Sequence, residues 1–501
     1  MNMTKSKYCA GLQCPKILWM QQNMPEKFDQ AALDESRIET GNAVGELAMG
    51  YFGQYEQVPY SPDKNEMITE TKRLINSGIK IITEASFAFE NNFCSADILR
   101  RTEEGFELIE VKSSTASDGD GPDTVKQAYI DDMAYQLYVL TNSGLSVDRV
   151  SIMQLNRDYV RNGELDIQSL FVLIDCTERV LEKQEEIQNN IDNIRSLVEQ
   201  TDEPGEPEIR ISSGCIGCGF EGWCMLGLPE NNVFEIGWSM WGSKKNDAYN
   251  NGFISFEDIL NGDVKLTDKQ MRQVKTAADN LPPLINKEQI RTFLSTVGYP
   301  LYHLDFETYQ QPIPLWDNVS PYMQIPFQYS LHIQDAPCGP VTHKEFLGLQ
   351  GADPRRALTE QLCADIPMNA CTMAYNMSFE KSQIKGLARI FPDLRDHLMS
   401  IHNNMVDVMV PFQSGAYYCR EMGGSYSIKK VLPALFPDDP ELNYKALSLI
   451  HNGGEAMAAF ATLHEKPPHE IAEIRAAMLA YCRLDTLAMV KILEKLYSIA
   501  K

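Results

Sequence analysis

The stretch Leu301-Tyr302-His303-Leu304-Asp305-Phe306-Glu307-Thr308 decides the fold of the second half of this chain. It is an apolar run that carries two acidic residues two positions apart. Residues i and i+2 of a strand point to the same face of a sheet. The stretch therefore predicts a strand on which the carboxylates of Asp305 and Glu307 lie side by side, where they can bind a pair of divalent metal ions.

A distant segment, residues 481–485, reads Tyr-Cys-Arg-Leu-Asp and has the pattern of a helix. Tyr481 and Asp485 are i,i+4 neighbours there, so their side chains share one face. This spacing lets the Asp485 carboxylate bind metal while the Tyr481 phenol orients a water molecule.

A fourth acid has two candidates. Residues 374–380 read Ala-Tyr-Asn-Met-Ser-Phe-Glu and place Glu380 directly after an Asn-x-x-Phe frame. Asp407 follows a short apolar run and competes for the same role.

These ordered motifs resemble the DEDD exonucleases of the RNase H-like fold, in the subgroup whose last motif carries a tyrosine. In that family the second acidic motif follows an Asn-x-x-Phe frame, so the resemblance ranks Glu380 first and Asp407 second. Glu380 departs from the family, which has aspartate at this position. The resemblance implies two Mg²⁺ or Mn²⁺ ions about 3.5 to 4 Å apart, which stabilise the attacking and leaving oxygens during phosphodiester hydrolysis. It also implies release of 5'-mononucleotides from the 3' end of a strand.

The first half of the chain contains a separate group of cysteines. Cys215, Cys218 and Cys224 form a C-x2-C-x5-C cluster, and Cys14 precedes a Pro-Lys-Ile-Leu-Trp segment, with Cys9 as its rival. Four thiolates suit either a four-iron four-sulfur cluster or a tetrahedral zinc ion. All eight histidines lie at or after His303, so they do not decide between the two. The remaining cysteines are scattered, and we expect them to be reduced structural residues.

Between these cysteines, residues 93–99 and 106–114 read as two paired strands that turn at Glu104-Gly105. The first strand carries Asp97, and the second carries Glu110 and Lys112 on one face. Lysine at this place can polarise an attacking water or stabilise the charge that develops on phosphorus.

This half resembles the iron-sulfur branch of the RecB-like PD-(D/E)XK nucleases, which includes the CRISPR-associated RecB-like exonucleases and the AddB helicase-nuclease subunit. The resemblance implies that Asp97 and Glu110 bind metal, that Lys112 is catalytic, and that the cysteines fasten the two ends of the domain together. Glu46 stands where many members have a metal-binding histidine. Gln136 corresponds to the glutamine of a later helix, although the tyrosine expected four residues after it is absent.

Composition sets the remaining expectations. The 501 residues, 44% of them hydrophobic, suffice for two to three domains with real cores. We find no run of eighteen apolar residues and no signal peptide, so we expect no membrane association. Twelve cysteines in a chain of this length indicate a reducing cytoplasm rather than a disulfide framework.

The net charge of -24 is unusual for a protein that binds nucleic acid. Binding would then depend on a local basic groove, on metal ions or on a protein partner. Lys244-Lys245 and Lys429-Lys430 are candidates for local positive charge. The second pair follows Gly423-Gly424 at the start of a predicted helix, which suits either a phosphate grip or an ordinary capped helix.

We therefore predict an α/β protein that resembles a bacterial family of unknown function joining the two nuclease types. Residues 1–228 form a restriction-endonuclease-like PD-(D/E)XK domain closed by the cluster of four cysteines. Residues 229–298 form a helical connector with short helices near 255–259 and 267–271 and a longer one over 287–297, and residues 299–501 form an RNase H-like DEDD domain with a mixed sheet.

The main hypothesis is a metal-dependent nuclease with two active sites that acts on single strands or ends of DNA, in repair, mobile-element processing or phage defence. One alternative is a nucleic-acid-binding scaffold in which one or both sites are inactive. Another is an RNA-processing exonuclease, because nothing in the sequence reads a 2'-hydroxyl.

Overall fold

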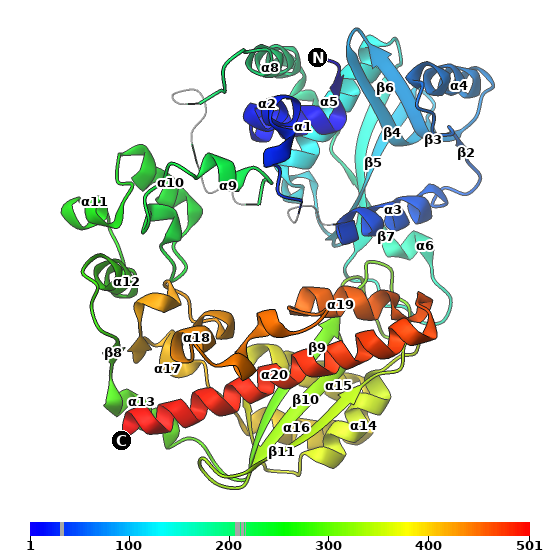
Figure 1. Cartoon of the computed structure of the whole chain (residues 1–501). Coiled ribbons are helices and arrows are strands. Elements are labelled where there is room, and N and C mark those ends of the chain that lie inside the picture. The colour runs from blue at the N-terminus through cyan, green and yellow to red at the C-terminus, as the bar shows by residue number, and fades with distance from the viewer. Residues whose placement is uncertain (31–34, 206–210, 212–214, 216) are drawn as a thin grey trace. The chain divides into compact units, whose positions relative to one another are not determined.

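The computed structural model describes residues 1–30, 35–205, 211, 215 and 217–501, with the side chains of 35–37 left aside (Figure 1). The fold is mixed α/β, as predicted. The chain divides into two compact units, residues 1–227 with 311–322 and residues 228–310 with 323–501. Within the described residues, no helix is both long and apolar enough to cross a membrane.

The first unit is built on a sheet in which the strands follow the order β2-β3-β4-β5-β6-β7, with β1 beside β4. Its strands are β1 (Met3–Thr4), β2 (Glu56–Gln57), β3 (Ile81–Phe89), β4 (Asn92–Arg101), β5 (Phe106–Ala116), β6 (Val147–Asn156) and β7 (Phe171–Asp175). β3, β4 and β5 form an antiparallel meander, and β5 pairs in parallel with β6. This arrangement sets the predicted strands of Asp97 and Glu110 side by side.

Helices cover both faces of this sheet. They are α1 (Lys5–Gln13), α2 (Pro15–Asn23), α3 (Glu35–Met49), α4 (Lys64–Asn76), α5 (Gln127–Asn142), α6 (Ile167–Leu170), α7 (Thr177–Leu181), α8 (Gln184–Val198) and α9 (Glu221–Cys224). α5 crosses over between β5 and β6, and seven of its sixteen residues are buried in the main core cluster. Val44 and Ala48 of α3 are buried with Ile98 and Ile109 in a second cluster.

The second unit holds a five-stranded sheet in the order β11-β10-β9-β12-β13. Its strands are β9 (Leu301–Tyr309), β10 (Ile325–Gln334), β11 (Val341–Leu347), β12 (Cys371–Ala374) and β13 (Met405–Asp407), and β8 (Leu284–Ile285) pairs separately with β14 (Tyr417–Tyr418). β9, β10 and β11 are antiparallel, whereas β12 and β13 run parallel to β9. The strand predicted from residues 301–308 is thus the central strand of the sheet.

The helices of this unit are α10 (Gly242–Asn250), α11 (Phe256–Asn261), α12 (Asp268–Ala278), α13 (Lys287–Leu294), α14 (Arg355–Asp365), α15 (Ser378–Ile390), α16 (Arg395–Asn403), α17 (Val410–Gln413), α18 (Ile428–Leu435), α19 (Gly453–Thr462) and α20 (Pro468–Ala500). The three helices predicted in 229–298 are confirmed as α11, α12 and α13. The first two begin with capping boxes at Ser255 and Thr267, which satisfy otherwise unpaired backbone N–H groups.

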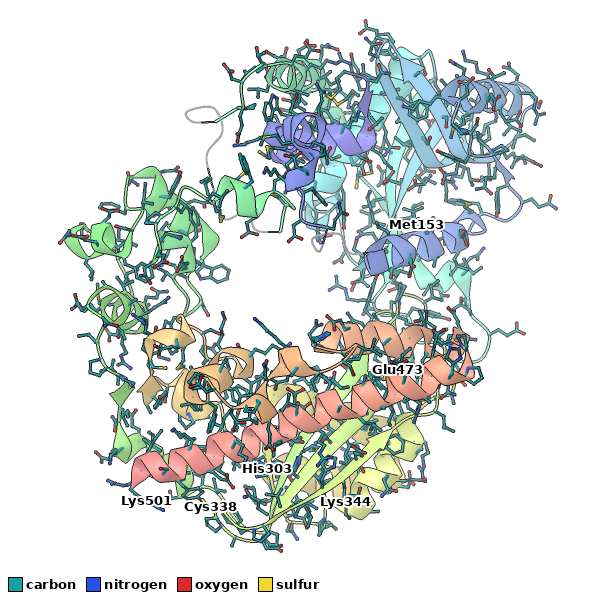
Figure 2. The ribbon with its side chains drawn as sticks, viewed as in Figure 1. Met153, His303, Cys338, Lys344, Glu473 and Lys501 are labelled. Carbon is teal, nitrogen blue, oxygen red and sulfur yellow. The ribbon has the colours of Figure 1, made fainter. Side chains whose placement is uncertain are left out.

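The two faces of β9 pack against different helices. Tyr302, Leu304 and Phe306 are buried with residues of α14, α15 and α16, whereas Leu301 belongs to the cluster formed with α13, α18 and α20. Because side chains alternate along a strand, Asp305 and Glu307 lie on the α20 side, together with His303 (Figure 2). The long helix α20 runs along this face of β9 and β10 (Figure 1).

The unit boundary differs from the predicted organisation in two respects. Residues 229–298, predicted as a separate connector, belong to the same compact unit as the second sheet. Residues 311–322, between β9 and β10, belong to the first unit, where the Arg161 amide donates to the Val319 carbonyl at 3.0 Å and Asn318 donates back at 2.9 Å. Local sequence patterns do not predict that the connection between β9 and β10 forms backbone hydrogen bonds with the distant segment around Arg161.

Candidate functional sites

The second unit concentrates acidic side chains between β9 and α20. Asp305, Glu307 and Cys482 offer ligand atoms that all lie within 4.8 Å of one another. The Cys482 thiol lies 3.7 Å from Oδ2 of Asp305. Cys482 was predicted to be a structural cysteine, and its position in the helix beside Tyr481 and Asp485 gives it a place at this site.

Four carboxyl groups share this buried region. Burial, with the charges of Asp485, Glu307 and Glu380, raises the pKa of Asp305 well above its usual value. Burial also raises the pKa of Glu307 to about 8, of Glu380 to about 8 and of Asp485 to about 6, and the charge of Lys429 opposes the rise at Glu307 and Asp485. Carboxylates this close are unfavourable as anions unless they keep protons or bind cations.

Glu380 and Asp407 have different surroundings. Glu380, on α15, is 2% exposed, and its Oε2 has no hydrogen-bond partner among the described residues. Asp407, at the end of β13, accepts from the backbone N–H groups of Asn376, Met377 and Met409 at 2.9 to 3.0 Å. Within the described residues, one carboxyl oxygen of Glu380 is therefore left without a donor, whereas Asp407 holds the turn that precedes α15.

Two tyrosines accompany Asp485. The Tyr444 hydroxyl donates to Asp485 Oδ1 at 2.5 Å, and the rings of Tyr444 and Tyr481 lie 5.9 Å apart. Burial and the Asp485 charge raise the pKa of both phenols, so both remain protonated donors at neutral pH. Sequence reasoning missed Tyr444, because it lies in a short turn forty-one residues before its partner.

The start of α19 also approaches this site. A Cβ added to Gly453 would lie 3.4 Å from Glu307 Oε2. Asn452 caps the helix by accepting from the Glu455 amide. The partial positive charge of a helix N-terminus favours anions, so α19 adds to the charge that Lys429 supplies.

The first unit gathers its predicted residues in one hydrogen-bond network. Lys112 donates to Glu110 Oε1 at 2.6 Å and to Asp132 Oδ2 at 2.7 Å, and Gln136 donates to Glu110 Oε2 at 2.7 Å. Asp97 accepts from the Val111 amide at 2.7 Å. Asp132, on α5 one turn before Gln136, was not predicted, although the i,i+4 spacing from a candidate glutamine is a signal that could have found it.

A second lysine enters this network from the N-terminal segment. Lys5 Nζ lies 2.9 and 3.1 Å from the two carboxylate oxygens of Glu110, 3.9 Å from Asp97 and 4.0 Å from Asp132. It is placed there because β1 pairs with β4, where Met3 is opposite Asn92 and Thr4 opposite Phe93. Two ammonium groups thus face three carboxylates.

This arrangement shifts the pKa values of the two predicted metal ligands, Asp97 and Glu110, in opposite directions. Burial favours the neutral form of Glu110, but Lys5 and Lys112 hold its pKa well below its usual range. Burial and the negative charge of Glu110 raise the pKa of Asp97 to about 7. Such a pair, with one carboxyl that is always charged and another that titrates near neutrality, is common at functional sites.

Glu46 does not take part in this network as far as the described residues show. It lies exposed on α3. The buried residues of α3 pack with Ile98 and Ile109, which alternate with Asp97 and Glu110 and therefore point to the opposite face of the sheet.

Three of the four predicted cysteine ligands pack in one small cluster. Cys14, Cys218 and Cys224 surround Trp19, Phe220 and their neighbours. Burial raises the pKa of all three thiols, and the proximity of Cys215 raises each pKa further. Cys9 instead packs against the main core, where burial and Asp132 raise its pKa to about 12. The structure therefore brings Cys14, rather than Cys9, to the other cysteines, while residues 212–214 and 216 lie outside the described part of the chain.

Lys245 and Lys429 differ in their surroundings. Lys245 is partly buried and donates to the Phe234 carbonyl at 2.7 Å, which gives it a structural role. Lys429 is exposed at the start of α18 and acts electrostatically on Glu307 and Asp485.

Comparison with known proteins gives partial matches. Residues 302–427 match a family described as a domain of unknown function (DUF2779), a region that contains Asp305, Glu307, Glu380 and Asp407. An uncharacterised protein of Ureaplasma parvum serovar 3 (UU173) is 30% identical over 165 residues, which cover 29% of this chain and 24% of that protein. The matched region is thus about a quarter of that relative, and no solved structure matches this chain.

Proposed function

We propose that this chain is a metal-dependent nuclease that hydrolyses DNA and has an active site in each unit. The observation that carries the proposal is the group of carboxyls formed by Asp305, Glu307, Glu380 and Asp485. Burial raises the pKa of all four, and the charges of Asp485 and Glu380 add to the rise at Asp305 and Glu307. Oxygen donors in this number and charge suit Mg²⁺ or Mn²⁺. The buried oxygen of Glu380, which has no hydrogen-bond partner within the described residues, supports this fit.

The fold of the second unit agrees with the proposal. Numbered from β9, its strand order is 3-2-1-4-5, with the first three strands antiparallel and the last two parallel. This order resembles the RNase H-like sheet, in which acidic residues of the central strand carry the metals. Asp305 and Glu307 occupy the central strand here.

The residues of this site have separable roles in the proposed reaction. Asp305, Glu307, Glu380 and Asp485 hold the ions, which when bound neutralise the charge that develops on the phosphate. The Tyr481 phenol, kept protonated by its surroundings, donates to the attacking water and orients it. Tyr444 fixes the Asp485 carboxylate through its 2.5 Å hydrogen bond. Lys429 and the start of α19 attract the phosphate backbone.

The first unit supports a PD-(D/E)XK site. Asp97 and Glu110 lie on neighbouring strands as a pair of oxygen donors, and Gln136 fixes Glu110. In this proposal Lys112, which contacts Glu110 and Asp132, polarises water or stabilises negative charge on phosphorus. We propose that Cys14, Cys215, Cys218 and Cys224 hold an iron-sulfur cluster, with zinc as the alternative, because four clustered thiols suit both.

A direct assay tests this proposal. The purified protein is incubated with Mn²⁺ or Mg²⁺ and end-labelled single-stranded DNA, double-stranded DNA and RNA, in parallel with Asp305→Asn, Asp97→Asn and the double variant. We expect cleavage of DNA that each single variant reduces and the double variant abolishes. Cleavage of RNA in preference to DNA would favour the RNA-processing alternative, and metal-independent binding without cleavage would favour a scaffold.

A further inference from the structure

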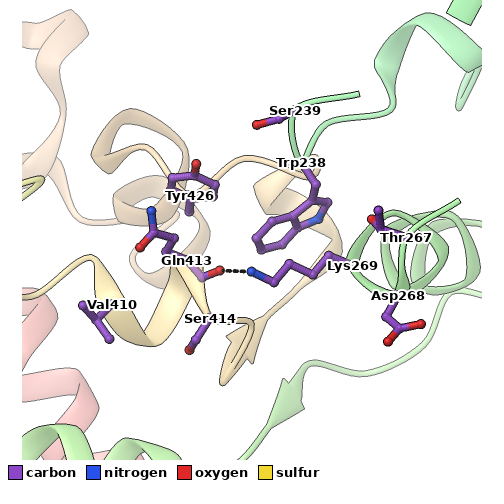
Figure 3. A pocket seen from close by; sticks show the side chains of 9 residues that line it. All are labelled: Trp238, Ser239, Thr267, Asp268, Lys269, Val410, Gln413, Ser414 and Tyr426. Carbon is purple, nitrogen blue, oxygen red and sulfur yellow. Dashed lines mark hydrogen bonds between the residues drawn. The ribbon is translucent and has the colours of Figure 1, made fainter. Parts of the chain in front are cut away.

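A pocket of about 640 Å³ opens in the second unit, and its lining residues include none of the four carboxylates of the candidate site (Figure 3). Trp238 and Tyr426 form its aromatic wall, Val410 and Ser414 lie on α17 and just after it, and Asp268 and Lys269 come from the start of α12. Pockets of 300 to 1,000 Å³ with an aromatic wall and a few polar groups are typical of small-molecule and cofactor sites. Its size is therefore sufficient for one nucleotide.

The aromatic wall is rigidly built. The rings of Trp238 and Tyr426 lie 5.6 Å apart, and the Tyr418 ring supports Trp238 from a distance of 5.9 Å. Trp238 and Ser239 both have positive φ, at 52° and 58°, a backbone conformation that costs energy in residues other than glycine. Hydrogen bonds from the Trp238 amide to the Gly424 carbonyl and from Gln270 to the Trp238 carbonyl hold this backbone in place.

Charge at the pocket is mixed. Lys269 lies over the Trp238 ring at 5.2 Å and donates to the Gln413 carbonyl at 2.6 Å (Figure 3). Asp268 is exposed at the same rim. A carboxylate here disfavours a phosphate inside the pocket, yet it can accept from the amino groups of a base. The chemistry therefore favours a nucleobase against the aromatic wall, with its phosphate outside near Lys269.

The chain connects this pocket to the carboxylate site. Val410 follows Asp407 by three residues, and Tyr426 precedes Lys429 by three, a separation that spans at most about 11 Å. The Tyr375 hydroxyl, next to the Asn376 frame of Glu380, donates to the Tyr426 carbonyl at 2.7 Å. The pocket is therefore within a few nucleotides of the place where a strand end would be cleaved.

From this placement we infer that the Trp238–Tyr426 pocket binds an unpaired base of the DNA strand whose 3' end lies at the carboxylates. This inference rests on the proposed function of the second unit. Aromatic side chains that stack on bases, together with a lysine, are the usual means of holding single strands without sequence preference. In a chain with a net charge of -24, such stacking lessens the dependence of binding on positive charge.

The test measures equilibrium binding of fluorescein-labelled single-stranded DNA by anisotropy, with EDTA present so that metal-dependent cleavage does not interfere. Trp238→Ala is expected to weaken binding by roughly tenfold, the usual effect of losing one base-stacking ring. Trp238→Phe keeps an aromatic face and should recover most of the affinity. Trp241→Ala is the matched control, because Trp241 is 75% exposed and lies three residues further on.

A second variant leaves the packing of Trp238 intact. Ser414 lines the pocket and is exposed, so Ser414→Tyr should fill the pocket and weaken DNA binding as Trp238→Ala does. Oligonucleotides of increasing length should show a gain in affinity for the wild-type protein once they reach the pocket, and this gain should be absent in both variants. Labelled RNA of the same sequence shows whether the pocket distinguishes the sugar.

Two results would overturn the inference. One is unchanged DNA binding in Ser414→Tyr and in folded Trp238→Ala, and the other is an equal loss in Trp241→Ala. Failure of the nuclease proposal would give a different result, because binding is measured without cleavage. In that case the pocket variants would still weaken binding, but the wild-type protein would cleave no DNA when metal is added.

Discussion

Glu380 and Asp407 allow a decisive comparison, because each becomes its own amide with little change of shape. Glu380→Gln removes a carboxyl whose pKa burial raises to about 8, whereas Asp407→Asn weakens three hydrogen bonds from backbone amides. If Glu380 binds metal and Asp407 holds the turn, the two variants should differ in opposite ways in activity and stability.

The magnitudes follow from these surroundings. Loss of residues that merely support a metal ligand costs 10- to 100-fold, so loss of a ligand at position 380 should lower exonuclease activity by more than about 100-fold. Asp407→Asn should keep activity within several-fold and cost about 1 to 3 kcal/mol of stability, because its buried backbone donors lose a charged acceptor.

The pH dependence gives a second criterion for Glu380. A carboxyl with a raised pKa in the folded state retains its proton while the unfolded chain loses its own, so stability falls as pH rises from about 4.5 to about 8. At about 1.4 kcal/mol per unit of pKa, the metal-free wild-type protein should lose up to ~4 kcal/mol relative to Glu380→Gln between pH 5 and pH 8.5.

The assay follows release of nucleotides from labelled single-stranded DNA in an Asp97→Asn background, which disables the proposed first site. Urea unfolding in EDTA at the two pH values measures stability. The reasoning is refuted if Asp407→Asn abolishes activity while Glu380→Gln retains it, or if the two proteins lose stability in parallel as pH rises.

Four further predictions concern other groups. Tyr481→Phe should lower kcat more than it changes KM, since only the hydroxyl that orients water is lost. The product should still be 5'-mononucleotides released from the 3' end, as chromatography of the products will show. Release from the 5' end or an unchanged kcat would contradict this prediction. Lys5→Met should destabilise the first unit in EDTA by about 3 to 5 kcal/mol, because it removes one of two cations and leaves Lys112 alone to face three carboxylates. Mn²⁺ should restore much of the loss. Lys7→Met is the control, and equal unfolding curves for the two variants would be contrary evidence. Cys218→Ser should remove the visible absorption and the bound iron of anaerobically purified protein, whereas the control Cys9→Ser should keep both. Absorption spectra and metal analysis measure the two properties. One stoichiometric zinc in a colourless wild-type protein would exclude iron. Gly237→Ala should destabilise the second unit, since a Cβ there would lie 2.3 Å from the Gly424 carbonyl oxygen, and an unchanged melting temperature would show that this approach is not needed.

Local sequence patterns were sufficient to predict strands and helices in segments whose polar and apolar residues alternate regularly. The alternation around Asp305 and the i,i+4 spacing of Tyr481 and Asp485 predict a strand and a helix, and both are present as β9 and α20. The capping residues Ser255 and Thr267 likewise mark the starts of two short helices. These signals lie within a few residues of one another, so tertiary structure is not needed to read them.

Local sequence patterns did not predict the residues that reach a site because segments far apart in the sequence contact each other. Lys5 meets Glu110 because β1 pairs with β4, and Tyr444 meets Asp485 from a turn in a segment without periodicity. For Lys5 and Tyr444 the side chain's identity is ordinary, and its partner lies dozens of residues away. The choice of Cys14 over Cys9 is different, because the Pro-Lys-Ile-Leu-Trp segment after Cys14 favoured it and only Cys14 contacts the Trp19 cluster.

The acidic character of the chain is compatible with the proposed chemistry for a physical reason. The formal charge of -24 counts Asp305, Glu307 and Glu380 as anions, but their raised pKa values mean that, without metal, they hold protons near neutrality. In the proposed function, divalent ions displace those protons and leave the site close to neutral, so the site would not be the strongly negative surface that the sequence indicates. Lys429 and the start of α19 then determine the local sign of the field, and a phosphate can approach a protein whose overall charge would repel it.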